Sequence, residues 1–201
     1  MVITDTLIQS RFSHQQLAEL ACAGGAEVIQ FRDKRLARSE FEAVAKRVGE
    51  VCRAHQVTLL VNDRVVAAYD AGADGVHLGR DDMSIADARA ILGPDKIIGA
   101  TAGSLDAALT AQDDGADYVG FGHIFATTSK VKGTPPVGLG ALAAMCKQLK
   151  IPVIAIGGIN ADNVGEVMRA GAWGVAVIGA VCAADDPRAA TTRMRGAMKL
   201  A

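Results

Sequence analysis

One short phrase occurs four times in the chain and constrains its fold more than any other feature. Each copy begins with glycine and alanine and follows a helical pattern; the copies are Gly25-Ala26-Glu27-Val28, Gly72-Ala73-Asp74-Gly75-Val76, Gly115-Ala116-Asp117-Tyr118-Val119 and Gly171-Ala172-Trp173-Gly174-Val175. Glycine after a helix supplies the left-handed turn that ends it. The short apolar run after each copy is typical of a strand that is buried on both faces. The phrase therefore predicts four helix-to-strand corners.

Four further apolar runs lie between these corners, at residues 2–4, 57–61, 97–100 and 153–156. Helical patterns separate the eight predicted strands, at residues 15–22, 39–55, 65–70, 84–92, 105–113, 139–149, 161–169 and 187–200. Strict alternation of strands and helices admits a closed eightfold barrel or an open doubly wound sheet. Eight equal units favour closure, so the expected α/β fold is a single small (β/α)8 TIM barrel, with residues 1–201 as one domain.

Composition narrows the classes of partner. The 21 basic and 22 acidic side chains leave a formal net charge of −1, so no overall field holds a polyanion and we expect no nucleic-acid partner. No apolar run approaches the roughly 18 residues that cross a bilayer, and no signal-peptide pattern follows Met1, so we expect a cytoplasmic protein without a membrane partner. The four cysteines, Cys22, Cys52, Cys146 and Cys182, form no C-x-x-C pair and are expected to be buried free thiols.

Polar side chains follow the predicted strands at their carboxyl ends, where barrels of this type carry their chemistry. After the second strand, the period of two puts Gln30, Arg32 and Lys34 on one face. If this face points into the barrel mouth, burying two cations without a counter-charge is costly, which implies an anionic ligand. The alternative is a strand end that has emerged into solvent.

Carboxylates follow the next two strands. The third strand ends at Asn62 and Asp63, and Asp81 and Asp82 follow the fourth. Two carboxylates on neighbouring strand ends are typical of a Mg²⁺ site, because this hard ion takes oxygen ligands and keeps waters for substrate phosphates. Singly, each carboxylate could instead cap the following helix. Together with the cations, they indicate a magnesium diphosphate.

Glycines and hydroxyl groups gather after the later strands. Gly157-Gly158 follows the seventh strand and Ile178-Gly179 the eighth, where glycine lets backbone N–H groups approach phosphate oxygens; a tight turn is the alternative. Residues 126–138 form the only long irregular segment and are a candidate lid. Its residues Thr127, Thr128, Ser129 and Lys130 could wrap an anion, although Lys130 could also be a plain solvated charge.

The four histidines are expected to differ in role. His123, at the end of the sixth strand, could act as a general acid or base near neutral pH. His77, inside the fourth strand, is expected to be a hydrogen-bonded core residue. His14 and His55 are expected to lie at the surface.

Over nearly the whole chain these residues resemble the thiamine phosphate synthase family and its close relative, the thiazole tautomerase family. The similarity rests on six ordered motifs: Gln30-Phe31-Arg32-Asp33-Lys34, Val61-Asn62-Asp63, Val76-His77-Leu78-Gly79-Arg80-Asp81-Asp82, Ile98-Gly99-Ala100-Thr101, Thr127-Thr128-Ser129-Lys130 and Ala155-Ile156-Gly157-Gly158-Ile159. Each motif alone is a weak signal, whereas six in order at six strand ends are a strong one.

The resemblance implies a transferase of thiamine biosynthesis, which couples hydroxymethylpyrimidine diphosphate to a thiazole phosphate and releases pyrophosphate. It implies phosphorylated small-molecule substrates, Mg²⁺ held by Asp63 and Asp82, and leaving-group stabilisation by Arg32, Lys34 and Lys130. By similarity, the pyrimidine diphosphate would contact Gln30, Arg32, Lys34, Asn62, Thr101 and Lys130. The thiazole phosphate would contact Thr127, Ser129, Gly158, Ile178 and Gly179.

Three positions depart from the synthase pattern: His123 stands where proline is usual, Gly179 where serine is expected, and Arg80 where an amide is usual. His123 is more similar to the tautomerases, in which a histidine here moves a proton on a carboxythiazole phosphate. An isomerase with His123 as acid–base is therefore the alternative function. A Schiff-base aldolase built on Lys34 or Lys130, and a non-catalytic barrel that binds a phosphorylated metabolite, are further alternatives. Because the chain starts almost at the first strand, the lower face of the barrel is expected to be either covered by a second subunit of a homo-oligomer or left uncovered.

Overall fold

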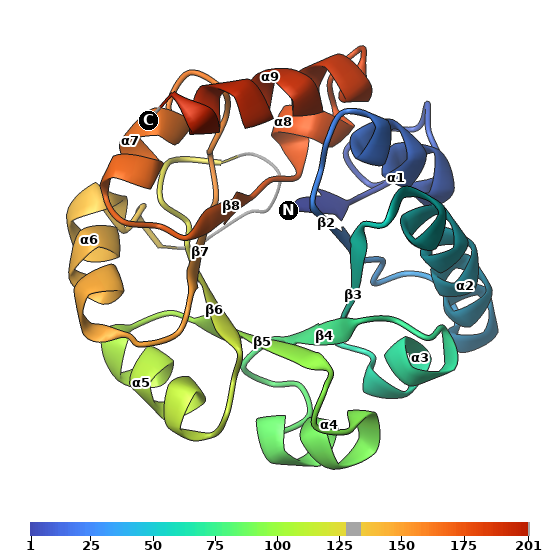
Figure 1. The fold of residues 1–201 in the computed structure, drawn as a ribbon, viewed down its shortest axis with the longest axis horizontal. Helices are drawn as coiled ribbons and strands as arrows, with labels where there is room; N and C mark the ends of the chain where they lie inside the picture. The colour runs from blue at the N-terminus through green and yellow to red at the C-terminus, as the bar shows by residue number, and fades with distance from the viewer. Residues whose placement is uncertain (128–133, 201) are drawn as a thin grey trace.

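The computed structural model of the chain describes residues 1–127 and 134–200, in which strands and helices alternate (Figure 1). The strands are β1 (Val2–Thr4), β2 (Val28–Phe31), β3 (Thr58–Asn62), β4 (Gly75–Leu78), β5 (Ile97–Ala102), β6 (Tyr118–Gly122), β7 (Val153–Ile156) and β8 (Gly174–Ala176). The helices are α1 (His14–Ala23), α2 (Arg38–His55), α3 (Val65–Asp70), α4 (Ile85–Leu92), α5 (Leu105–Asp113), α6 (Gly138–Gln148), α7 (Val164–Arg169), α8 (Gly179–Cys182) and α9 (Pro187–Lys199).

The strands form one parallel sheet in the order β1 to β8, which curves into a barrel with the helices outside it (Figure 1). A bridge between Val2 and Val177 joins the two ends of the sheet, with hydrogen bonds from Ile3 N to Val177 O (2.9 Å) and from Val177 N to Met1 O (3.1 Å). The predicted barrel is therefore confirmed. Because all strands are parallel, their carboxyl ends open at one end of the barrel.

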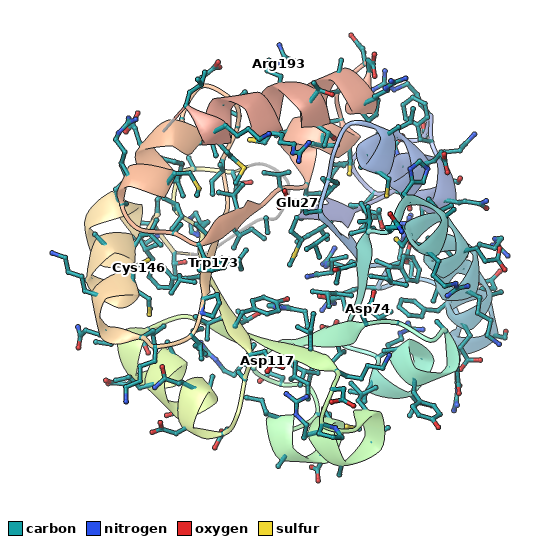
Figure 2. The ribbon with its side chains drawn as sticks, in the orientation of Figure 1. Glu27, Asp74, Asp117, Cys146, Trp173 and Arg193 are labelled. Carbon is teal, nitrogen blue, oxygen red and sulfur yellow. The ribbon has the colours of Figure 1, made fainter. Side chains whose placement is uncertain are left out.

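The four repeated phrases lie at the corners that lead into β2, β4, β6 and β8, so the repeat describes a unit of two strands and two helices. Their first glycines have φ values of +92°, +63°, +91° and +98°, as expected of left-handed helix ends. Figure 2 labels the third residue of each copy around the barrel, namely Glu27, Asp74, Asp117 and Trp173. The carboxylates of Asp74 and Asp117 accept the backbone N–H groups of Leu59 and Ile98 at 2.8 and 2.7 Å. These two corners are thereby joined to the preceding strands.

Alternation along each strand separates the core from the mouth. On β2, Ile29 and Phe31 are fully buried, and the ring of Phe31 lies 4.5 Å from that of Phe41 in α2. Gln30, between them in sequence, instead lines a cavity inside the barrel. Outward-facing apolar side chains thus build the core against the helices, while inward-facing positions near the mouth can be polar.

The structure differs from the prediction beside the seam between β8 and β1. The apolar run continues to Ile178, but β8 ends at Ala176 and the short helix α8 starts at Gly179. Residues 5–13 form a second long irregular segment, so the expectation of only one was wrong. The guanidinium of Arg11 lies 2.8 Å from the carboxylate of Asp185, which follows the C-terminal end of α8, so this segment contacts the chain after α8.

Side chains cap four of the helices at their first turn. Ser13, Ser84, Ser104 and Asp186 each accept a backbone N–H of the helix that follows. Cys22, Cys52 and Cys182 are buried, Cys146 is half-buried, and all four are free thiols. Within the described residues, no helix is long and apolar enough to cross a membrane.

Candidate active site at the barrel mouth

Two hollows open at the carboxyl ends of the strands. The first, of about 170 Å³, lies inside the barrel; the second, of about 440 Å³, lies over the ends of β7 and β8, and both are lined by Thr127, Gly157 and Ile178. The predicted site residues around the first are Gln30, Arg32, Asn62, Thr101, His123, Thr127 and Ile178, and the second adds Gly158 and Gly179. Residues 128–133 of the predicted lid, which include Ser129 and Lys130, lie outside the described residues.

Both cations that follow β2 have acidic partners. Nη1 of Arg32 donates to Oδ2 of Asp5 at 2.9 Å, and Nζ of Lys34 lies 3.2 Å from Oδ2 of Asp63. The expectation that these cations lack counter-charges was therefore wrong, because the ends of β1 and β3 each supply one. The pairs differ in exposure, since the Arg32 side chain is 17% exposed and that of Lys34 is 56% exposed. A ligand would meet one largely buried guanidinium and one ammonium in solvent.

Asp63 and Asp82 lie together at the ends of β3 and β4, and neither caps a helix. Helix α3 begins after Arg64 without a side-chain cap, and Ser84 caps α4. Asp63 has the left-handed φ of +63°, while Oδ2 of Asp82 accepts the backbone N–H of Gly79 at 2.6 Å. Burial raises the pKa of Asp63 and the Asp82 carboxylate raises it further, whereas Lys34 lowers it. The two carboxylates therefore repel each other.

This carboxylate pair fits a divalent cation. An ion between the two would relieve their repulsion, and carboxylate oxygens are the ligands that Mg²⁺ prefers. Within the described residues no group of three or more potential His, Cys, Asp or Glu ligands is present. Two protein carboxylates would leave the other coordination positions to water and phosphate oxygens, which is the common pattern for Mg²⁺.

His77 joins two side chains inside the barrel. Its Nδ1 lies 2.8 Å from the hydroxyl of Tyr118 and its Nε2 lies 2.8 Å from Oγ1 of Thr101. The rings of His77 and Tyr118 stack with centroids 5.5 Å apart. Burial lowers the pKa of His77 to about 4, so a neutral imidazole holds Thr101 at pH 7. The predicted hydrogen bonding of His77 is confirmed, but its side chain lines the first hollow rather than the core.

The glycine pair after β7 allows a close approach of the chain. Gly157 and Gly158 have φ values of +100° and +68°, and a Cβ on either would collide with His123 or with the Ala126 carbonyl. The side-chain amide of Asn163 donates to the carbonyl of Gly158 at 3.0 Å, which fixes the loop. Backbone and small side chains thus line much of the second hollow, as in the phosphate cradles of such barrels.

His123 lines the first hollow and lies against Gly157, which lines both hollows. Its residue is 6% exposed and lines the first hollow, and its carbonyl accepts the backbone N–H of Val137 at 2.9 Å. Among the described residues, its imidazole has no hydrogen-bond partner. The ring nitrogens are therefore available to a ligand.

His14 is buried, so the prediction of a surface position was wrong; His55 is exposed as expected. Nδ1 of His14 lies 2.8 Å from Oγ1 of Thr4, and Nε2 lies 3.1 Å from Oδ2 of Asp33. Burial lowers the pKa of His14 more than Asp33 raises it. This pair connects the first residue of α1 to Asp33, the residue that follows Arg32 after β2.

Sequence reasoning missed Asp5 and Tyr118. Asp5 lies two residues after the inward-facing Ile3, so continuing the period of two beyond β1 would have found it. Tyr118 sits inside an apolar run and carries no such signal. The one sequence feature related to the position of Tyr118 is Gly99 on the neighbouring strand, where a Cβ would collide with the tyrosine ring.

Comparison with known proteins identifies the family to which the chain belongs. The family model described as "Thiamine monophosphate synthase" matches residues 1–181. The chain belongs to this family. It is 46% identical over 194 residues to the thiamine-phosphate synthase of Chloroflexus aurantiacus (96% of this chain and 89% of the relative), and 47% identical over 197 residues to that of Salinibacter ruber (98% and 87%).

Solved structures agree with the family. Thiamine phosphate pyrophosphorylase from Pyrococcus furiosus superposes with a TM-score of 0.90 at 40% identity, covering 99% of this chain and 94% of that one. A 3-hexulose-6-phosphate synthase superposes with a TM-score of 0.71 at 21% identity, a likeness that shows the barrel fold alone. Family and fold thus agree over the elements that build both hollows.

Proposed function

We propose that this chain is a thiamine-phosphate synthase, which couples hydroxymethylpyrimidine diphosphate to a thiazole phosphate and releases pyrophosphate. The observation that carries the proposal is the joint placement of two cations, a carboxylate pair and a glycine cradle at one barrel mouth. Relatives named thiamine-phosphate synthase at 46 and 47% identity support it. Two adjoining hollows suit two phosphorylated substrates that react with each other.

The protein side chains divide into two groups under this proposal. Arg32 in the first hollow and the exposed Lys34 after β2 bind the diphosphate. In the same hollow, Gln30, Asn62 and Thr101 orient the pyrimidine end. In the second, the backbone around Gly158 and Gly179 binds the thiazole phosphate. Lys130 and Ser129 are assigned to the diphosphate and the thiazole phosphate by resemblance only.

Asp63 and Asp82 would hold Mg²⁺, which when bound would supply positive charge to the departing pyrophosphate. The chain itself provides charge and position. Cleavage of the pyrimidinylmethyl C–O bond sends its electron pair to pyrophosphate, and the thiazole nitrogen then forms the new C–N bond. Arg32 and Lys34 stabilise the growing negative charge, while the glycine cradle holds the thiazole nitrogen in line with the reacting carbon.

A direct assay tests the activity. Purified protein is incubated with hydroxymethylpyrimidine diphosphate, thiazole phosphate and Mg²⁺, and thiamine phosphate and pyrophosphate are followed by chromatography. We expect equimolar formation of both products, loss of both in EDTA, and a loss of about 100-fold or more in Arg32→Gln. Arg193→Gln, on the outer face of α9 (Figure 2), should keep the wild-type rate. Wild-type protein that forms neither product would refute the synthase, and full activity in EDTA would refute the magnesium assignment.

The position of His123 at the first hollow, with no hydrogen bond to its imidazole among the described residues, favours a second candidate function, a thiazole tautomerase with this residue as acid–base. The same assay separates the two functions when each tautomer of the carboxythiazole phosphate is supplied. Interconversion of the tautomers without release of pyrophosphate would identify the isomerase. Formation of thiamine phosphate identifies the synthase.

A further inference from the structure

Asp5 is a buried carboxylate inside the barrel mouth. In the register of β1 and β2, Ile3 pairs with Gln30 and Thr4 with Phe31, so the next step along both strands puts Asp5 beside Arg32. Asp5 is only 3% exposed. A carboxylate this deeply buried is unfavourable unless it is paired and hydrogen-bonded.

Both carboxylate oxygens of Asp5 have partners. Oδ1 accepts the backbone N–H of Leu7 at 2.7 Å, and Oδ2 accepts Nη1 of Arg32 at 2.9 Å. The contact with Leu7 prevents the carboxylate from rotating, because it anchors one oxygen to the segment after β1. Asp5 therefore holds the guanidinium of Arg32 from a fixed point.

The guanidinium keeps donors for a ligand. Arginine carries five N–H donors in a rigid planar fork, and Asp5 occupies one of them in the described part of the structure. Arg32 lines the first hollow, so its remaining donors can reach an anion there. The other cation, Lys34, is held only at the surface, with more than half of its side chain exposed.

We propose that Asp5 is a positioning residue for the synthase reaction, which fixes the fork of Arg32 toward the departing pyrophosphate. The inference rests on the proposed function. Asp5 has two opposite effects. Its negative charge weakens the attraction of Arg32 for any bound anion, whereas its fixed geometry removes the cost of orienting Arg32 as charge develops in the transition state. Loss of Asp5 should therefore reduce turnover more than it reduces pyrophosphate binding.

Asp5→Asn tests this split. We expect kcat to fall by about tenfold or more, because small errors of placement slow catalysis strongly, while the Kd of inorganic pyrophosphate, measured calorimetrically in the presence of Mg²⁺, stays within about threefold or becomes tighter. The matched control is Asp117→Asn at the opposite end of the barrel, where a carboxylate also accepts one arginine, Arg89, and one backbone N–H, that of Ile98. The control should lower Tm and leave kcat unchanged.

A double-mutant cycle completes the test. In an Arg32→Gln background, Asp5→Asn should have little further effect on kcat, because Asp5 acts through Arg32. Wild-type kcat in folded Asp5→Asn, or an equal loss of kcat with and without Arg32, would overturn the inference. If Asp5→Asn does not fold, Asp5→Glu keeps the charge but displaces it, and wild-type kcat in that variant would overturn the inference equally. Inactive wild-type protein would instead refute the proposed function.

Discussion

At the scale of single residues, both cations after β2 form ion pairs with carboxylates at the ends of the neighbouring strands. Asp5 after β1 holds Arg32 after β2, and Lys34 in the same segment reaches Asp63 after β3. Asp63 in turn lies against Asp82 after β4, which raises the pKa of Asp63 after burial has already done so. Around this side of the mouth, Asp5 thus pairs with Arg32 and Lys34 with Asp63, while Asp63 also faces the like charge of Asp82.

Replacing Asp63 by asparagine tests the proposed magnesium site. Asparagine tolerates the left-handed φ of this position, so Asp63→Asn should fold while removing one of the two charges. We expect a loss of about 100-fold in kcat, because the proposed Mg²⁺ would no longer stabilise the leaving group. We also expect weaker binding of Mn²⁺, measured by electron paramagnetic resonance. Asp81→Asn, at the exposed neighbour of Asp82, should change neither quantity. Unaltered Mn²⁺ binding in Asp63→Asn would contradict the assignment.

The sequence predicted the kinds of residue at the mouth better than their partners. Gln30, Arg32, Asn62, Thr101 and the glycines do line the hollows, because the period of two and the strand ends fix their direction. Which carboxylate pairs with each cation depends on the register between neighbouring strands, and this register cannot be read from the sequence. For this reason Asp5 was missed, and His14 was expected at the surface although the end of β2 covers it.

At the scale of elements, glycines in the strands make room for ring side chains. Gly99 on β5 lies where a Cβ would collide with the ring of Tyr118 on β6. Tyr118 holds His77, and His77 holds Thr101 at the mouth. The absence of a side chain at Gly99 therefore makes room for the hydrogen-bonded series Tyr118, His77 and Thr101, which spans β6, β4 and β5.

Adding one methyl group at this position should break that arrangement. Gly99→Ala forces the Tyr118 ring to move, and overpacking of this kind costs about 1–3 kcal/mol of the free energy of unfolding, measured by urea denaturation. Gly140→Ala in α6 is the matched control, because no atom lies within 4 Å of its added Cβ, and helix propensity predicts a gain of up to about 1 kcal/mol. Equal stability of the two variants would show that the glycine on β5 is not needed for packing.

Element order was predictable because each corner repeats the same local chemistry, a left-handed glycine followed by an apolar run. The boundaries failed where that chemistry is absent. β8 is only three residues long, and the apolar residues after it pass into α8. Hydrophobicity alone does not distinguish a buried strand from a short buried helix.

At the scale of the whole molecule, two histidines should change stability with pH in opposite directions. The buried His14 has a lowered pKa because burial disfavours its charged form, so below about pH 6.5 the unfolded chain binds a proton that the folded chain resists. Its contribution to stability is present above pH 6.5 and is lost as pH falls. The exposed His55 has a pKa raised by Glu19, so its contribution is present below pH 6.5 and is lost as pH rises.

Urea unfolding between pH 5 and 8, in roughly half-unit steps around the ordinary histidine pKa, separates these contributions. The stability lost in His14→Gln should grow as pH rises, since burial disfavours the charged imidazole and the folded chain resists the proton that the unfolded chain binds at low pH. The stability lost in His55→Gln should shrink over the same range. Parallel curves for wild type and His14→Gln would mean that this histidine keeps its ordinary pKa in the folded barrel. In that case the buried contact between α1 and β2 would be insensitive to pH, and burial would not be the force that sets its charge.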